Sequence, residues 1–236
     1  MKIIVISISA YKEKDGIITA LTEDGVESFT VKGLYDPKSK NAYLNSVLTV
    51  ADVELGSGRF KYPLIKNSVI LESPLKKSTD FTYLSSILVI CEATKVLLQD
   101  FEQKMMFKHL DAAMYALNHQ NDYWMTVLIY LVNCFKASGY ELEVNRCVNC
   151  GSKKNIKTFS FEEGGFLCDK CITPDTDMFF DKEIMLLVRD ACNAVDYAHG
   201  SEYCNKENAI KLLNKMQEFI IDAYGISLNS ITLLTK

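Results

Sequence analysis

Two pairs of cysteines, spaced for a shared metal ion, constrain the fold of this chain more than any other feature. Cys147 and Cys150 form one Cys-x-x-Cys pair, Cys168 and Cys171 form a second, and 17 residues separate the two pairs. A Cys-x-x-Cys turn directs two sulfurs toward one ion, and tetrahedral zinc takes two more from a second such turn. The spacing therefore predicts one zinc ion, and its role is structural because four thiolates leave no position for water or substrate.

Three other interpretations of these cysteines compete with zinc: disulfide bonds, a redox-active dithiol, and ordinary buried thiols. The doubled spacing favours zinc over all three. Gly151 follows the first pair and Gly164-Gly165 precede the second, which allows tight turns close to the metal. The aromatic residues between the pairs are expected to cover one side of a small hairpin, and they are Phe159, Phe161 and Phe166.

Length and charge place the chain among ordinary globular proteins. Its 236 residues suffice for one or two domains with a substantial core. The net charge of −4 is unlike that of a general polyanion-binding protein, although it permits a local basic face. The start of the chain lacks a secretory signal and the other four cysteines are scattered, so we expect a reducing, cytoplasmic location. The longest apolar run, residues 124–135, is too short to span a bilayer.

Residues 1–78 show the pattern of short strands. Glu23-Asp24-Gly25 predicts a hairpin turn, and Gly56-Ser57-Gly58 predicts another turn. Five or six strands in this length indicate a small barrel, and an OB-type barrel fits, although other small barrels fit the pattern equally well. The expected strands lie at residues 2–9, 16–21, 26–31, 44–55, 59–64 and 68–71.

Residues 79–236 are expected to be helical apart from the cysteine module. Thr79-Asp80 can cap the first helix, Ser138-Gly139 ends a later one, and Gly225 ends the last before a short tail. The expected helices cover residues 81–101, 105–118, 123–137, 181–199 and 206–224. The predicted fold class is therefore α+β and multidomain: an OB-type barrel at 1–78, then a helical domain at 79–236 with a zinc module, 145–173, inserted in it.

Charge differs between the two predicted domains. Residues 1–78 carry 11 Lys and Arg against 9 Asp and Glu, whereas residues 79–236 carry 15 against 21. OB-type barrels bind single-stranded nucleic acid by placing cationic side chains along the phosphates and aromatic rings against the bases. The alternative is that the lysines of residues 1–78 form a solvated face of the barrel and that its aromatic rings belong to the core. The candidate DNA-binding cations are Lys32, Lys38, Lys40, Arg59 and Lys61, and the nearby rings are Tyr11, Tyr35, Tyr43, Phe60 and Tyr62.

Sequence signatures of catalysis are missing. The chain has no phosphate-binding loop, no dinucleotide fingerprint, no H-E-x-x-H and no G-x-S-x-G. The three histidines are isolated in predicted helices. We therefore expect a protein that is not an enzyme.

Three motifs, in this order, resemble the RecO family of bacterial recombination mediators. Val31-Lys32-Gly33 followed by Pro37-Lys38-Ser39-Lys40 resembles the family's basic loop in its N-terminal OB domain. The segment from Arg146 to Cys171 is similar to the family's zinc module, and Ala223-Tyr224-Gly225 with Leu228 and Ser230 is similar to its closing segment. Together the motifs extend over essentially the whole chain.

The resemblance implies a non-enzymatic role in DNA repair. Family members bind single- and double-stranded DNA, anneal complementary strands, and bind the acidic C-terminal tail of the single-strand-binding protein. With RecR they help to load RecA onto coated single strands, in the cytoplasm at the nucleoid. By this resemblance Lys32, Lys38 and Lys40 match basic positions of the DNA-binding loop, and the four cysteines match the metal ligands.

The chain also departs from the family pattern. Leu34-Tyr35-Asp36 stands where the family often has arginine-rich sequence, and Asp36 places an acid in the proposed DNA site. An adaptor that binds mainly proteins is therefore the alternative function, with zinc stabilising its helical domain and a vestigial barrel. A nucleotide-processing enzyme with a structural zinc is a third hypothesis, which the missing phosphate loop disfavours.

Overall fold

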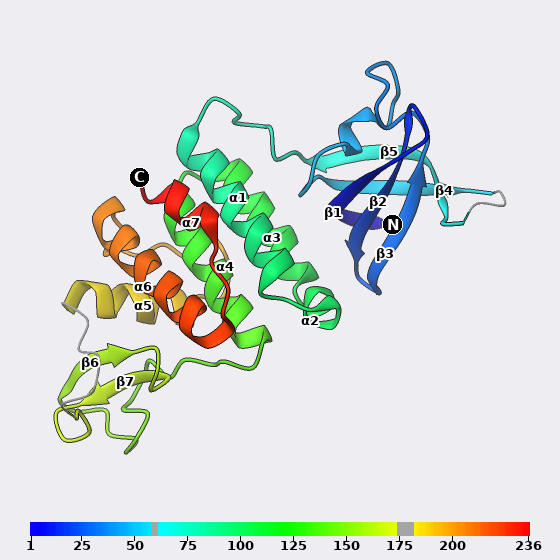
Figure 1. Ribbon diagram of the computed structural model, residues 1–236. Coiled ribbons are helices and arrows are strands. Elements are labelled where there is room, and N and C mark those ends of the chain that lie inside the picture. The colour runs from blue at the N-terminus through cyan, green and yellow to red at the C-terminus, as the bar shows by residue number, and fades with distance from the viewer. Residues whose placement is uncertain (58–60, 174–181) are drawn as a thin grey trace.

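The computed structural model describes residues 1–57, 61–173 and 182–236, and these form a barrel followed by a helical part with a small hairpin module at its far end (Figure 1). The strands of the barrel are β1 Lys2–Tyr11, β2 Asp15–Thr22, β3 Gly25–Val31, β4 Val50–Gly56 and β5 Leu64–Glu72, with a short 3₁₀ helix at Ala42–Leu44. The helices are α1 Phe81–Val96, α2 Asp100–Met105, α3 Phe107–His119, α4 Tyr123–Ala137, α5 Lys182–Asn193, α6 Lys206–Tyr224 and α7 Asn229–Leu234. The module hairpin is formed by β6 Ile156–Ser160 and β7 Gly165–Cys168.

The barrel is closed in the order β1-β2-β3-β5-β4. All its neighbouring strands are antiparallel except β3 and β5, which pair in parallel. Five strands in a partly Greek-key closed barrel are the arrangement of an OB-fold, so the predicted fold class is confirmed. Closure leaves no free sheet edge.

The first strand is buried on both of its faces. Side chains alternate along a strand, so Ile3 and Val5 point one way and Ile4 and Ile6 the other. Ile3 and Val5 belong to the core inside the barrel, whereas Ile4 and Ile6 belong to the larger core shared with the helices. The apolar start of the chain is therefore a strand between two cores.

Two strand predictions differ from the structure. The run expected at 44–55 becomes a strand only from Val50, because Leu48 adopts a positive φ of 67° that a strand does not allow. Of the run expected at 59–64, residues 59 and 60 lie outside the described residues, and Leu64 belongs to a single strand, β5, which also includes the run expected at 68–71. Its polar middle residues, Lys66 and Asn67, both donate to the carboxylate of Glu54 on β4, so polar residues there extend the strand instead of ending it.

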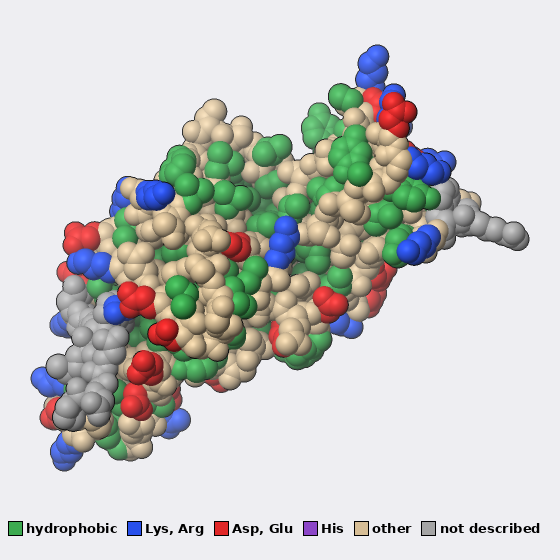
Figure 2. Space-filling view, in the orientation of Figure 1, with side chains coloured by type: hydrophobic (Ala, Val, Ile, Leu, Met, Phe, Trp, Pro, Cys, Tyr) green, Lys and Arg blue, Asp and Glu red, His purple; other side chains and the backbone are tan. Residues whose placement is uncertain are grey.

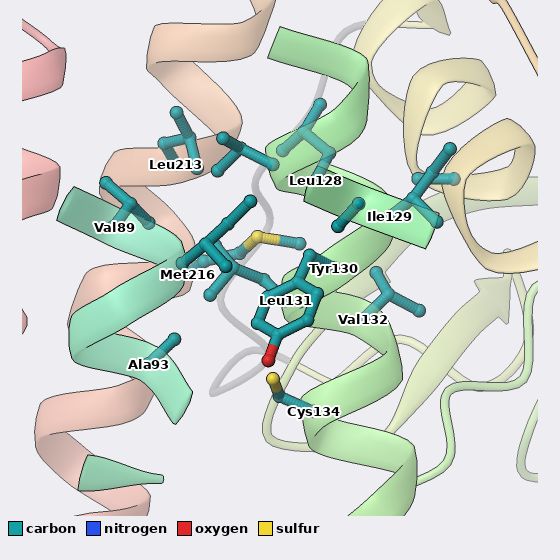
Figure 3. Close-up of a cluster of buried hydrophobic side chains, with 14 of the residues drawn as sticks. Val89, Ala93, Leu128, Ile129, Tyr130, Leu131, Val132, Cys134, Leu213 and Met216 are labelled. Carbon is teal, nitrogen blue, oxygen red and sulfur yellow. The ribbon is translucent and has the colours of Figure 1, made fainter. Parts of the chain in front are cut away.

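The helices pack around α4, which lies at the centre of the helical part (Figure 1). Eleven of its 15 residues are buried, which explains its nearly continuous apolar sequence. Figure 3 shows its side chains beside Val89 and Ala93 of α1 and beside Leu213 and Met216 of α6. The bounds predicted for α4 and α6 are those observed.

The first helix is shorter than predicted, and a last helix was not predicted at all. The helix expected at 81–101 ends at Val96, where the side-chain amide of Gln103 donates to the carbonyls of Thr94 and Leu98. The expected tail contains α7, whose first backbone N–H groups, at Asn229 and Ser230, donate to the carboxylate of Glu92 on α1. In both cases a side chain outside the helix supplies its end with hydrogen-bond partners: Gln103 lies nine residues from Thr94, and Glu92 lies 138 residues from Ser230.

A buried polar network joins the barrel to the helical part. Glu72, at the end of β5, accepts from the side-chain amide of Asn118 at 2.6 Å and contacts His119 Nε2 at 2.8 Å. Asn118 in turn accepts from the Tyr83 hydroxyl at 2.7 Å. Lys2 on β1 pairs with Asp111 on α3 at 2.6 Å. The two parts are therefore tied by polar contacts as well as by the shared apolar core.

Candidate metal centre and nucleic-acid interface

The hairpin brings the two cysteine pairs together. Cys168 is the last residue of β7 and pairs with Ile156 on β6. The first pair is attached to the same strand, because the backbone N–H of Val148 donates to the carbonyl of Phe166 at 2.8 Å. A tight turn closes each pair, with hydrogen bonds from Gly151 N to Cys147 O and from Cys171 N to Cys168 O. Gly151 has a φ of 73°, which glycine adopts without strain.

The four sulfurs are positioned as one tetrahedral ligand set. The Sγ atoms of Cys147, Cys150, Cys168 and Cys171 all lie within 4.8 Å of one another. The sulfurs of Cys150 and Cys168 are 3.6 Å apart, close to the roughly 3.8 Å edge of a tetrahedron with metal–sulfur bonds of about 2.3 Å. A disulfide needs about 2.05 Å, and all eight cysteines, each in the described part of the chain, are free thiols. The residues therefore fit a metal ion and exclude the disulfide interpretation here.

The thiols of this cluster shift one another's pKa values. Burial raises the pKa of the Cys147 thiol, but N–H groups of the backbone near its sulfur outweigh this and lower its pKa below the usual value. The pKa of Cys171 is raised to about 12, mainly by hydrogen bonding with Cys150 and then with Cys147. Four neighbouring thiolates repel one another, and a divalent cation removes that conflict.

The other four cysteines do not join this cluster. Cys134 is buried in α4 and the remaining three are half-buried. Burial is the main cause of their raised pKa values, and for Cys192 and Cys204 the pKa is raised to about 12. They are structural thiols of the helical core, at Cys91, Cys134, Cys192 and Cys204.

Aromatic rings attach the metal module to the helices. Phe161 stacks on Phe219 of α6 at 5.2 Å between ring centroids, and Phe159 meets Phe161 edge to face. The Tyr140 hydroxyl, just after α4, donates to the carbonyl of Phe161. The predicted aromatic cover of the hairpin is present, and it faces the helical core.

The basic loop after β3 is an ordered series of turns. Gly33 has a φ of 66°, and a Cβ there would lie 2.8 Å from Ser39 Oγ, so the loop closes tightly on glycine. The N–H of Gly33 donates to Asp15, and the N–H of Lys38 donates to Asp36. Lys38 and Lys40 have exposed side chains, as does Lys32.

Asp36, the acid expected to weaken this loop, has a cationic partner of its own. Its carboxylate contacts the Lys14 ammonium at 3.2 Å. The Lys38 backbone N–H, and then Lys14, lower the pKa of Asp36 below its usual value. The acid therefore holds the turn and pairs with a lysine outside the predicted cluster.

The second basic segment lies beside the end of β3. Thr30 donates its backbone N–H to Pro63 O and its hydroxyl to Tyr62 O, so residues 62 and 63 run beside Thr30 of β3. Lys61 is exposed and its ammonium lies 5.2 Å from the Tyr62 ring. The prediction for Arg59 and that for Phe60 fall outside the described residues. On the face shown in Figure 2, Lys and Arg side chains gather over the outer end of the barrel.

Among the predicted stacking rings, Tyr43 is the most open. Its side chain is 75% exposed, against 42% for Tyr11 and 39% for Tyr35. Rings that stack on bases must be accessible to them. Tyr43 follows the basic loop directly, so its ring and Lys40 occupy the same stretch of chain.

The histidines lie in separate surroundings. His119 contacts Glu72 in the junction network, while His109 lies against the Tyr197 ring and hydroxyl on another face of α3. His199 is exposed in the connection before α6. Within the described residues, the arrangement has no histidine paired with a nucleophile as a hydrolytic site requires.

The fold and the cysteine cluster together define a class: an OB-type barrel joined to a helical bundle that carries a four-cysteine metal module. The family description "Recombination protein O C terminal" matches residues 78–180. Among curated proteins, the "DNA repair protein RecO" of Oceanobacillus iheyensis is 24% identical over 226 residues, covering 94% of this chain and 86% of the relative. The "DNA repair protein RecO" of Caldanaerobacter subterraneus is 29% identical over 195 residues, covering 77% and 75%. That of Clostridium perfringens is 28% identical over 172 residues, covering 71% and 70%.

These matches support the RecO family for this chain. The resemblance seen in its three motifs is thereby confirmed, and the names of these relatives describe proteins of DNA repair. None of the helices in the described ranges is long and apolar enough to cross a membrane.

Proposed function

We propose that this chain is a non-enzymatic recombination mediator that binds single- and double-stranded DNA through its barrel. The observation that carries the proposal is an ordered basic loop beside the most exposed tyrosine of the barrel. Lys32, Lys38, Lys40 and Lys61 would contact phosphates, together with Arg59. Tyr43 would stack on a base.

The test is a titration of fluorescent single-stranded DNA at several salt concentrations. Lys32→Ala combined with Lys38→Ala should weaken binding and lower the slope of log affinity against log salt by roughly one for each lost phosphate contact. Lys136→Ala is the matched control, because Lys136 is exposed but pairs with Glu141 in the helical part, away from the barrel. Unchanged affinity and slope in the double variant would show that DNA binds elsewhere.

The proposed cofactor is a single zinc ion held by the four cysteines. Four thiolates suit zinc, which prefers tetrahedral sulfur ligation in structural sites. The ion would contribute folding stability to the hairpin and would take no part in a reaction. Metal analysis of the purified chain tests both the metal's identity and its ratio to protein, and a ratio far below one would contradict the proposal.

The proposed partners follow from family membership. They are RecR, the acidic C-terminal tail of the single-strand-binding protein, and RecA indirectly, at the nucleoid in the cytoplasm. Annealing of complementary strands coated with single-strand-binding protein, with and without RecR, measures the mediator activity. No acceleration under any of these conditions would contradict the proposal.

A protein-binding adaptor remains the second candidate, because an exposed apolar face runs along α1. Phe81 is 58% exposed, Leu88 47% and Val96 38%. Single exposed apolar residues are normal, but a row of them along one helix is a feature of interaction surfaces. Strong annealing by the isolated chain would count against the adaptor, whereas absent annealing with intact partner binding would favour it.

A further inference from the structure

Helix α1 is apolar on the side that faces solvent as well as on the side that faces the core. Only two of its 16 residues are charged, Glu92 and Lys95. Its inner side packs against α3, α4 and α7 (Figure 1). A helix that is apolar on all sides is normally buried on all sides. The sequence of α1 therefore indicates a further layer that covers its outer side.

The outer side of α1 carries five side chains in line, here called the α1 stripe: Phe81, Leu84, Leu88, Cys91 and Lys95. Phe81, Leu88 and Lys95 are exposed, whereas Leu84 and Cys91 are half-buried. Their spacings alternate between three and four residues, which keeps side chains on one line along a helix, as in the seam of a coiled coil. The stripe is therefore shaped to receive another helix that lies alongside α1.

A hollow of about 440 Å³ lies beside the C-terminal half of the stripe, between α1 and α7. Its apolar lining comes from Leu88, Cys91, Val96 and Leu233. The Glu92 carboxylate at the hollow is already bonded, because it accepts from the backbone N–H groups that begin α7. The largest apolar side chain of the stripe, the 58% exposed Phe81, lies at the opposite end of the helix.

An exposed ring and a hollow at opposite ends of one helix allow that helix to pair with its own copy. In a two-fold dimer the same surface of each chain meets itself, so every projecting group must find its acceptor on that surface. Phe81 and Lys95 are each seven residues from Leu88. Antiparallel packing about an axis at Leu88 therefore places Phe81 of each chain opposite Lys95 of the other, where the hollow lies.

We propose that α1 binds a second copy of this chain through the α1 stripe, antiparallel, with Leu88 of both copies in contact on the two-fold axis. The Phe81 ring of each copy fills the hollow of the other, and the Lys95 ammonium lies over that ring as a cation–π pair. Two helices in contact along about 24 Å bury roughly 1,000 Å², the lower limit for a specific interface. The dimer is therefore weak, with a dissociation constant on the order of micromolar.

The charges of this face favour a second copy over a different protein. The two Lys95 groups of the dimer lie about 20 Å apart along the paired helices, beyond the range of effective repulsion in physiological salt. A strongly charged partner would find a single cation on the stripe, because the Glu92 carboxylate is held by α7. The chain's own stripe is complementary instead, since it is apolar and carries its cation at the end opposite its ring.

The test is sedimentation velocity of the full metal-loaded chain, without DNA, at concentrations that span the micromolar range. A monomer–dimer equilibrium is expected. Leu88→Glu alone and Leu88→Lys alone should each raise the dissociation constant roughly tenfold or more, because each places two like charges on the axis. An equimolar mixture of these two variants should restore association, since opposite charges then meet there. Phe81→Ser should also weaken the dimer, because it leaves the hollow unfilled.

Val195→Glu and Val195→Lys are the matched controls, since Val195 is 92% exposed, lies outside α1 and α7, and takes the same changes of charge. Thermal unfolding and metal content show that each variant remains folded. The proposal is overturned if the control variants dissociate as much as the Leu88 variants, or if the mixture of Leu88 variants fails to associate. A wild type that stays monomeric up to roughly 100 μM also overturns it and leaves this face to a different partner protein.

Self-association through α1 does not depend on the DNA binding proposed for the barrel. Lys32→Ala combined with Lys38→Ala should dimerise as the wild type does, because both lysines lie outside α1 and α7. Since sedimentation is measured without DNA, a failure of the dimer and a failure of the proposed function are distinguishable.

Discussion

Single residues determine the conformation of the basic loop after β3. Gly33 permits the close approach to Ser39, and Asp36 is held by the Lys38 N–H and by Lys14. The sequence alone indicates that the negative charge of Asp36 weakens DNA binding by this loop. In the fold it is a paired turn residue, and this could not be predicted because Lys14 lies on a different strand connection 22 residues earlier.

At this scale we predict that Tyr43→Ala weakens binding of single-stranded DNA. Base stacking on an exposed ring contributes roughly tenfold in affinity, and the ring is not needed for the core. The measurement is the same fluorescence titration at fixed salt. Tyr115→Ala, which removes a ring that is 56% exposed on α3, is the control and should leave DNA affinity unchanged. Equal affinities for the wild type and Tyr43→Ala would remove Tyr43 from the DNA surface.

A buried residue gives a second prediction, for stability. Asn118→Ala removes the amide that donates to Glu72 and the acceptor of the Tyr83 hydroxyl. Leaving a buried carboxylate short of a donor costs about 2 kcal/mol. Urea unfolding should show this loss, whereas Asn45→Ala, at an exposed amide, should change stability by less than about 0.5 kcal/mol. A neutral Asn118→Ala would mean that the network contributes nothing to the junction.

At the scale of elements, the module hairpin depends on one close backbone approach. Gly165 on β7 forms a bridge with Glu143, and a Cβ at Gly165 would lie 2.2 Å from the Glu143 carbonyl oxygen. Backbone atoms cannot move aside as flexible side chains do. The paired glycines therefore have different roles, although both look like turn residues in the sequence.

The expected result is that Gly165→Ala lowers stability and metal retention far more than Gly164→Ala. Gly164 has a φ of 81° but open space at its Cβ, so alanine there costs about 1–2 kcal/mol of backbone strain. At Gly165 the steric clash should add about 1–3 kcal/mol. Thermal unfolding and metal content of the two variants make the comparison. Similar losses in both would show that β7 can shift away from Glu143.

At the scale of the whole molecule, the metal module is attached to one end of a shared core. Phe159, Phe161 and Phe166 belong to the same apolar cluster as α4 and α6, and that cluster also includes Ile4 and Ile6 of the barrel. The interior of the barrel has its own cluster around Phe29. The division into domains at residue 78 stays a prediction, which metal removal tests.

We predict that chelating the metal destabilises the helical part before it affects the barrel. Hydrogen exchange should rise first in β6, β7 and the end of α6, while β2 and β3 stay protected. Simultaneous exchange in all strands would show that the barrel and the helices unfold as one unit.

The stability that the metal gives to the module should also depend on pH. Protons compete with the metal for the thiolates, so this stabilisation is present at neutral and higher pH and is lost as pH falls. The lowered pKa of Cys147 and the raised pKa of Cys171 shift this competition in opposite directions.

The sequence by itself determined the features that depend on local pattern: the paired cysteines, the strands up to Val31, and the helices α4 and α6, whose periodicity and end signals lie within the segments. The resemblance to the RecO family also followed from motifs in order. Only the tertiary structure decided the end of α1 at Val96, where Gln103 donates to its last turn, the capping of α7 by Glu92, and the pairing of Asp36 with Lys14. It also gathered Lys153, Lys157, Lys182 and Arg189 into one groove within an acidic half of the chain. The physical reason is that hydrogen bonds and charge act over a few ångströms in space, and the partners in these cases are separated along the chain.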